Sequence, residues 1–245
     1  MINSKTSLQL ILKRGNMAAL AWTTLIAIIA SHQGLFAHEQ PTAIYLIRHA
    51  QTEWNAQKRI QGAGSNPSLS AQGKEQAQML ADKIIRNYSD ITAVYSSDLN
   101  RALETAQAFA GPLGLTVQKT EKLREIRWCQ DIEGLVATEE SLGTERYYQW
   151  RDGRIPGSET IDEVVARMHS IVGEIVQQHS GEKVALVSSG RATSLFLKSI
   201  LAENLLPSID NCTIITLTTS DGVSFTLSRV DRLEAIQHNK KGWRG

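Results

Sequence analysis

Short apolar runs alternate with longer amphipathic stretches along most of this chain, and this alternation restricts the possible folds more than any other feature. The short runs have the length and composition of buried strands. They lie at 43–47, 93–96, 115–118 and 184–187, and the amphipathic stretches predict helices over 70–86, 99–110, 158–178 and 191–203. This alternation predicts an α/β fold, a three-layer α/β/α sandwich around a mostly parallel central sheet.

Local signals indicate where some of these elements begin and turn. Two further runs, 212–218 and 223–230, flank a Ser-Asp-Gly sequence, which predicts a β-hairpin. Ser70 is the expected N-cap of the first helix. Ser158 and Glu159 are expected to cap the third helix and to favour its positive N-terminal end.

The first 37 residues differ in kind from the rest of the chain. Lys5, Lys13 and Arg14 form a basic start without Asp or Glu, and an apolar stretch follows from Met17 to Ala30. This pattern is typical of an export signal cleaved after Ala37. The alternative is an uncleaved membrane anchor, although the apolar stretch is short of the ~20 residues that a spanning helix needs. Either way, the protein is expected outside the cytoplasm, periplasmic or membrane-anchored, with membrane contact only through an uncleaved segment.

Residues 38–245 are expected to form one domain, because no low-complexity linker interrupts them. Hydrophobic residues make up 42% of the chain, enough for one sizeable core. Removing the three basic residues of the first segment from the chain's 26 leaves 23 against 25 acidic residues, so no nucleic-acid partner is expected. The two cysteines, Cys129 and Cys212, need not pair, because spacing alone cannot bring their side chains together.

Candidate chemistry lies where the predicted strands end, because ligands of α/β sheets bind beyond the carboxyl ends of the strands. The first strand is followed by Arg48 and His49, with Thr52 and Asn55 shortly after. An arginine grips a phosphate through two parallel hydrogen bonds, and a neutral imidazole can attack phosphorus. Thr52 and Asn55 can add neutral donors to the same oxygens.

This segment closely resembles the signature of the histidine phosphatase (phosphoglycerate mutase-like) superfamily, and the resemblance continues in register over nearly all of residues 42–230. The stretch Tyr95–Ala106 resembles the segment that supplies a second phosphate-binding arginine, here Arg101. The stretch Leu123–Trp128 resembles the segment whose glutamate protonates the leaving oxygen, here Glu125. A structural role as a partner of neighbouring arginines is the alternative for Glu125.

One position departs from the family pattern at a place that matters for the chemistry. The stretch Val184–Gly190 resembles a strand and turn that normally end in Ser-His-Gly, and Ser189 stands where the second histidine is expected. Serine is shorter and uncharged, so it can only weakly replace that histidine at the phosphoryl group. His169 and His179 are expected to be solvated rather than to substitute for it. Arg191 could reach back to the phosphate or lie exposed on its helix.

The resemblance implies a phosphatase that works through a phosphohistidine on His49, with Glu125 as the acid. Arg48, Asn55, Arg101 and Ser189 would bind the phosphoryl group of a phosphorylated small molecule, and no metal or organic cofactor is needed. Phosphatase is favoured over mutase because the stretch between Glu125 and Pro156 lacks the long insertion of the mutases. The alternatives left open are a non-catalytic phosphate-ester binding protein descended from a phosphatase, and a purely structural envelope domain.

Overall fold

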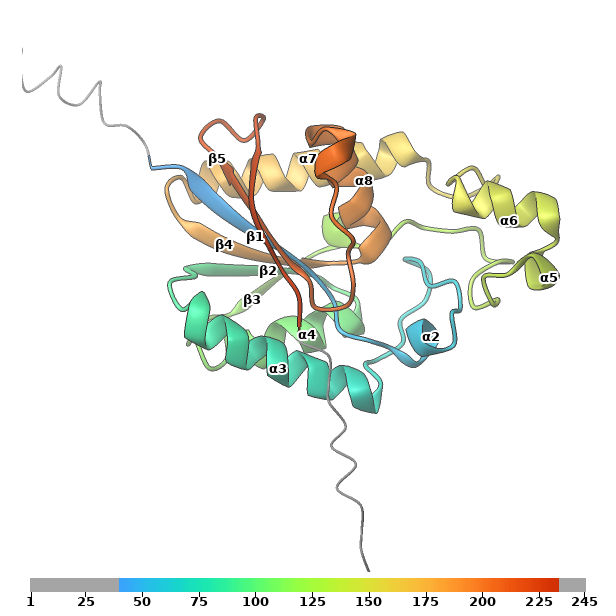
Figure 1. Ribbon diagram of the computed structural model, residues 1–245, viewed down its shortest axis with the longest axis horizontal. Helices are drawn as coiled ribbons and strands as arrows, with labels where there is room; N and C mark the ends of the chain where they lie inside the picture. The colour runs from blue at the N-terminus through green and yellow to red at the C-terminus, as the bar shows by residue number, and fades with distance from the viewer. Residues whose placement is uncertain (1–39, 234–245) are drawn as a thin grey trace, which may run out of the picture. The chain divides into compact units, whose positions relative to one another are not determined.

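A six-stranded sheet forms the centre of the computed structural model, which describes residues 40–233 (Figure 1). The strand order is β3-β2-β4-β1-β5-β6. The strands are β1 (Thr42–Arg48), β2 (Ala93–Ser97), β3 (Val117–Thr120), β4 (Lys183–Ser188), β5 (Ile214–Thr219) and β6 (Thr226–Asp231). β3, β2, β4 and β1 are parallel to one another, whereas β5 runs antiparallel to both β1 and β6. The sheet is therefore mixed, with the parallel part predicted from the strand–helix alternation.

Helices cover both faces of this sheet, which confirms the α/β sandwich. The long helices are α3 (Ala71–Asn87), α4 (Asn100–Ala110), α7 (Ile161–Gln178) and α8 (Gly190–Ile200). The shorter ones are α2 (Glu53–Ala56), α5 (Glu139–Leu142), α6 (Thr144–Arg151) and the 3-10 turns η1 (Glu121–Leu123) and η2 (Glu203–Leu205). In Figure 1, α3 and α4 lie on one side of the sheet and α7 and α8 on the other.

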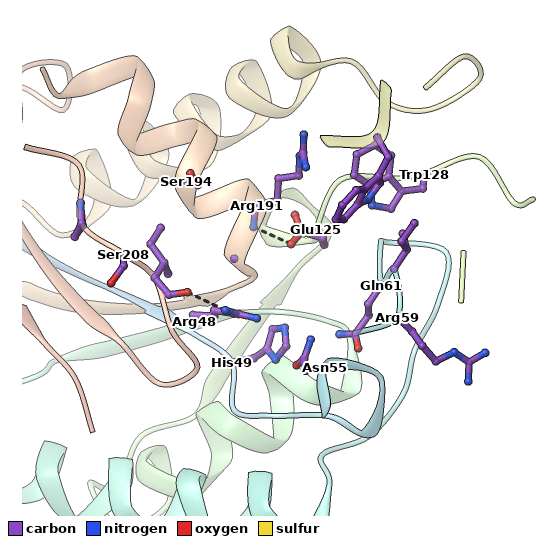
Figure 2. A pocket seen from close by; sticks show the side chains of 15 residues that line it. Arg48, His49, Asn55, Arg59, Gln61, Glu125, Trp128, Arg191, Ser194 and Ser208 are labelled. Atoms are coloured by element: carbon purple, nitrogen blue, oxygen red, sulfur yellow. Dashed lines mark hydrogen bonds between the residues drawn. The ribbon is translucent and has the colours of Figure 1, made fainter. Parts of the chain in front are cut away.

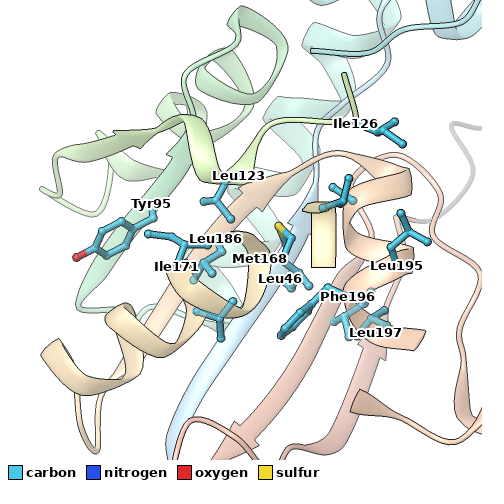
Figure 3. Close-up of a cluster of buried hydrophobic side chains, with 14 of the residues drawn as sticks. Leu46, Tyr95, Leu123, Ile126, Met168, Ile171, Leu186, Leu195, Phe196 and Leu197 are labelled. Atoms are coloured by element: carbon cyan, nitrogen blue, oxygen red, sulfur yellow. The ribbon is translucent and has the colours of Figure 1, made fainter. Parts of the chain in front are cut away.

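The two-residue period of the central strand divides the core between these layers. Ile44 and Leu46 of β1 belong to one buried cluster, which includes residues of α7 and α8 (Figure 3). Ala43, Tyr45 and Ile47 belong to a second cluster with residues of α3 and α4. Because both faces of β1 are buried, its sequence is a continuous apolar run rather than an alternating one.

The structure corrects some predicted helix and strand ends. Ser70 is the N-cap of α3 as expected, with its Oγ accepting from Gly73 N at 3.0 Å. Helix α7, however, starts at Ile161 instead of residue 158, and its N-cap is Thr160, which forms a capping box with Glu163. Ser158 therefore does not cap this helix, because the capping-box pair lies two residues further along the chain.

The predicted hairpin is present, with a longer turn than expected. β5 ends at Thr219 and β6 begins at Thr226, three residues later than the sequence suggested. The carboxylate of Asp221 accepts the backbone N–H groups of Val223 and Ser224, at 2.8 and 2.7 Å. Those two N–H groups are satisfied inside the turn, so the strand ladder starts only beyond them.

The carboxyl ends of β1, β2 and β4 meet at one edge of the sheet, at Arg48, Ser97 and Ser188. This edge carries the side chains of the candidate site. Residues 1–37, to which the export signal was assigned, lie outside the described residues. Within residues 40–233, no helix combines the length and apolar character that a membrane crossing requires.

Candidate active site

A cavity of about 450 Å³ opens at the carboxyl ends of β1 and β4 (Figure 2). It brings together four of the six residues singled out in the sequence: Arg48, His49, Asn55 and Glu125. The remaining lining residues come from loops and helices that follow the strands. They are Arg59, Ile60, Gln61, Trp128, Trp150, Gly190, Arg191, Ser194, Pro207, Ser208 and Ile209.

His49 is buried at the floor of this cavity and has one ring nitrogen committed to the backbone. Its Nδ1 lies 2.7 Å from the carbonyl oxygen of Ala50, and because a carbonyl can only accept, Nδ1 carries the proton. Within residues 40–233, Nε2 has no hydrogen-bond partner, so its lone pair remains available. Burial lowers the pKa of His49 well below its usual value, and the charges of Arg101 and Arg48 lower it further. The imidazole is therefore neutral at pH 7.

Arg48 lies beside His49, and its guanidinium makes one hydrogen bond to the described protein. Nη1 donates to the carbonyl oxygen of Ile209 at 2.8 Å, while Nε is buried with no protein partner among the described residues. A Cβ at Gly190 would lie only 3.1 Å from that Nε, so the glycine allows the guanidinium to pack against the start of α8. The geometry leaves donors of Arg48 for an anion.

Asn55 presents its amide NH₂ to the cavity because its amide oxygen is already used. Oδ1 accepts the backbone N–H of Thr52 at 3.1 Å and lies 3.5 Å from Nδ2 of Asn211. Thr52 itself is fully buried and its hydroxyl donates to Gln61 Oε1 at 2.6 Å. The structure therefore places Asn55 as a donor in the cavity, but directs the hydroxyl of Thr52 elsewhere.

Glu125 lines the cavity with both carboxylate oxygens bound to backbone N–H groups. Oε2 accepts from Arg191 N at 2.9 Å, the dashed contact in Figure 2. Oε1 accepts from Ala192 N at 2.8 Å and from Ile126 N at 2.9 Å. The carboxylate thus occupies the positive N-terminal end of α8, which fixes its position opposite His49.

Arg101 and Ser189 are buried next to this cavity but do not line it. Nη1 and Nη2 of Arg101 donate to the carbonyls of Ser65 and Gly62, each at 3.0 Å, and its Nε has no partner in the described part of the chain. Burial lowers the pKa of Arg101 to about 10, and its charge still acts on His49. The hydroxyl of Ser189 is buried without a hydrogen bond to any described residue.

Sequence reasoning missed the side chains that form the outer wall. Trp150, from α6, and Trp128 line the cavity with ring centroids 6.5 Å apart. The guanidinium of Arg191 lies 5.0 Å from the centre of the Trp128 ring and donates to the carbonyl of Arg151 at 2.7 Å. Arg191 is therefore neither exposed nor directed at His49. The only sequence signal for this wall was the presence of Trp128 near Glu125 and of three aromatic residues, Tyr147, Tyr148 and Trp150, close together further along the chain.

The other described histidines do not replace the expected second histidine. His169 and His179 are partly buried rather than solvated, and neither lines the cavity. His169 contacts the hydroxyl of Ser199, and His179 contacts Tyr95 and Glu182. Among residues 40–233, no cluster of His, Cys, Asp and Glu side chains has the geometry to hold a metal ion.

A central sheet of this order, with the cavity at the carboxyl ends of its parallel strands, defines an α/β protein of the phosphoglycerate mutase-like class. A sequence profile of the histidine phosphatase superfamily (branch 1) matches residues 44–231. The chain belongs to this superfamily. A probable phosphoglycerate mutase, GpmB, from Escherichia fergusonii is 34% identical over 209 residues, covering 82% of this chain and 89% of the relative.

Solved structures of phosphatases share the fold. Phosphoserine phosphatase from Entamoeba histolytica, in complex with 3-phosphoglyceric acid, has a TM-score of 0.66 and 26% identity, covering 79% of this chain and 98% of its own. A mycobacterial glucosyl-3-phosphoglycerate phosphatase, in complex with VO3, has a TM-score of 0.66 and 26% identity, covering 76% of this chain and 96% of its own. The similar proteins thus include both phosphatases and mutases, and they support a phosphatase-type enzyme.

Proposed function

We propose that this chain is an exported phosphomonoesterase that forms a phosphohistidine on His49. The observation that carries the proposal is the state of that ring: Nδ1 donates to Ala50, Nε2 has no hydrogen-bond partner among residues 40–233, and Arg48 lies beside it in a cavity of about 450 Å³. A neutral imidazole with a fixed tautomer is what nucleophilic attack on phosphorus requires. The cavity volume suits a phosphorylated small molecule.

The proposed reaction proceeds in two steps. Arg48 and the amide of Asn55 hold the phosphoryl group, Nε2 of His49 attacks phosphorus, and the ester P–O bond breaks. Glu125 in its acid form gives its proton to the departing alkoxide, which leaves as an alcohol. Water then attacks the phosphohistidine, its proton passes to Glu125, the N–P bond breaks, and inorganic phosphate and neutral His49 are restored. Neither step uses a metal or an organic cofactor.

Arg101 and Ser189, which the sequence analysis expected to bind the phosphoryl group, have a smaller role in the proposed mechanism. Arg101 supports the site as a buried positive charge, with its Nε free to turn to a ligand after a small movement. The hydroxyl of Ser189 is buried without a hydrogen bond to a described residue, and it carries no charge, so the transition state lacks one cationic donor. The loss of one such donor typically costs about 10² to 10³ in rate. Phosphate monoester hydrolysis is so slow without a catalyst that an enzyme weakened in this way still gives measurable turnover.

Two observations favour the second candidate, a non-catalytic binder of phosphate esters. Both oxygens of Glu125 already accept backbone N–H groups, and the hydroxyl of Ser189 has no partner in the described structure. A binder would need Arg48 and Asn55 but neither an acid nor a second histidine. The two candidates differ in turnover, not in affinity for phosphate.

The deciding experiment is a paired assay of the exported domain and its Ser189→His variant on phosphoserine, 3-phosphoglycerate and other phosphate monoesters. We expect measurable wild-type turnover, trapped phosphohistidine that is absent in His49→Gln, and a gain of about 10² in the Ser189→His variant. Ser189→Ala is the matched control and should behave as wild type, because the hydroxyl makes no hydrogen bond to any residue of the described part of the chain. Phosphate binding without turnover or trapped phosphohistidine in wild type would favour the binder.

Export is proposed from the basic and apolar character of residues 1–37. The test is expression of the full chain in a bacterial host, followed by fractionation and mass measurement of the mature protein. We expect the protein outside the cytoplasm with an N-terminus at His38. A full-length mass in the membrane fraction would instead identify the segment as an anchor. A full-length protein in the cytoplasm would contradict export.

A further inference from the structure

The loop at 156–160 and helix α7 do not line the active-site cavity, yet they contact the segment that carries Glu125. This segment, residues 124–128, follows η1 and belongs to no helix or strand. Its backbone carbonyls have no sheet or helix partners, and buried carbonyls require donors from elsewhere. The backbone position of Glu125, as distinct from that of its carboxylate at the start of α8, therefore depends on the groups that donate to these carbonyls.

Arg167 of α7 is the main donor. Its Nη1 donates to the carbonyls of Lys122 and Arg124, at 3.0 and 2.7 Å, and its Nη2 donates to the carbonyl of Glu125 at 3.1 Å. Nε and Nη2 also bind the two carboxylate oxygens of Glu159, at 2.6 and 3.0 Å. All five N–H bonds of the guanidinium are thereby used.

Glu159 binds the backbone of Arg127, which follows Glu125 in the same segment. Its backbone N–H donates to the carbonyl of Arg127 at 2.7 Å, and its carboxylate accepts the backbone N–H of Arg127 at 3.0 Å. The side chains of Arg167 and Glu159 are only 18% and 14% exposed, so solvent screens this ion pair less than a surface pair. The backbone on both sides of Glu125 is therefore held by one partly buried ion pair.

We propose that Arg167, oriented by Glu159, is a positioning residue that holds the backbone of Glu125 so that its carboxyl group reaches the leaving oxygen. This inference rests on the proposed function, because it assigns Arg167 a role through the acid step. Arg167 itself touches neither the cavity nor the reacting atoms. A displacement of about 1 Å at a catalytic group can cost about 10² in rate.

The test compares substrates that differ in their need for an acid. 4-Nitrophenyl phosphate releases a stable phenolate, whereas phosphoserine releases an alkoxide that must be protonated. We expect Arg167→Lys, which cannot make the five bonds, to lower kcat on phosphoserine at least tenfold and on 4-nitrophenyl phosphate less than threefold (order-of-magnitude expectations). In a Glu125→Gln background the same substitution should no longer distinguish the two substrates.

Arg124→Lys is the matched control. Arg124 lies in the same segment, but its guanidinium binds Asp98 and Glu121, so its loss should affect both substrates alike. Glu159→Gln is the second variant in case Arg167→Lys does not fold, and it should show the same substrate difference to a smaller extent. Equal losses on both substrates, or a substrate difference that persists in the Glu125→Gln background, would overturn the inference alone. A wild-type protein inactive on both substrates would overturn it together with the proposed function.

Discussion

Nδ1 of His49 donates to the carbonyl oxygen of Ala50 across 2.7 Å, a contact between adjacent residues that decides which nitrogen faces the cavity. Because that bond fixes the tautomer, the free electron pair is on Nε2. Burial and two arginines keep the ring neutral by lowering the pKa of His49. The backbone at the end of β1 thus prepares this side chain for nucleophilic chemistry before any ligand arrives.

The buried neutral imidazole should make the protein sensitive to acid. The pKa of His49 is lower in the folded than in the unfolded chain, where it is about 6.5. Above that pH neither state binds the proton and stability is unaffected; below it only the unfolded state does, so stability is lost as the pH falls. The loss approaches about 1.4 kcal/mol per pH unit.

Chemical denaturation of wild type and His49→Gln between pH 8 and pH 5 (roughly one unit and more either side of the unfolded pKa) measures this effect. The free energy of unfolding of the variant should fall less steeply below about pH 6.5. His169 and His179 are the same in both proteins, so their contributions cancel in the comparison. Parallel curves would show that His49 titrates alike in the folded and unfolded chain.

Gly190→Ala should weaken phosphate binding through Arg48. The added Cβ would lie 3.1 Å from Nε and 3.3 Å from Cζ of that guanidinium, which must then move from its place. A charge-assisted hydrogen bond is worth about 1.5–3 kcal/mol, so we expect at least a tenfold loss of affinity for inorganic phosphate, measured by calorimetry. Gly173→Ala is the control: its Cβ meets no atom within 4 Å, and helix propensity favours it by up to about 1 kcal/mol. Unchanged affinity in the Gly190 variant would mean that Arg48 does not need its observed position.

Thr160→Ala should destabilise the protein by removing the N-cap of α7. Its hydroxyl accepts the backbone N–H of Glu163 at 3.2 Å, half of the capping box. Such a loss costs about 0.5–2 kcal/mol, measurable by urea denaturation. Thr160→Ser keeps the hydroxyl and should retain most of the stability. An equal loss in both variants would show that the methyl group, rather than the cap, stabilises the helix.

The two cysteines should react differently with a thiol reagent. Both are free in the structure; Cys129 is partly exposed, whereas Cys212 is buried and its pKa is raised to about 12 by that burial. Because the thiolate is the reactive form, Cys212 should react only after unfolding. A colorimetric thiol assay on the native protein should therefore count one thiol, and Cys129→Ser should remove it. No reactive thiol in native or unfolded protein would instead indicate a disulfide.

The sheet and its helices could be predicted because their signals are local. Ile44 and Leu46 face one core cluster while Ala43, Tyr45 and Ile47 face the other, so the strand between two helix layers had to be apolar throughout. The N-cap at Ser70 was likewise predictable from a short pattern. Ser158 shows how such a pattern can be misread, because two suitable caps occur close together and only Thr160 has a glutamate three residues later that completes a capping box.

The sequence by itself determined that an arginine and a histidine follow the first strand of an α/β sheet and that Glu125 belongs to the same site. Only the tertiary structure decided that Glu125 binds the N–H groups of Arg191 and Ala192, which lie 66 and 67 residues further along the chain. It also decided that Trp150 lines the cavity, whereas Arg101 and Ser189 do not. The physical reason is that the spacing of apolar residues along a short stretch of sequence determines which strands and helices form. Hydrogen bonds between residues far apart in the sequence form only when the sheet and the helix layers have packed together.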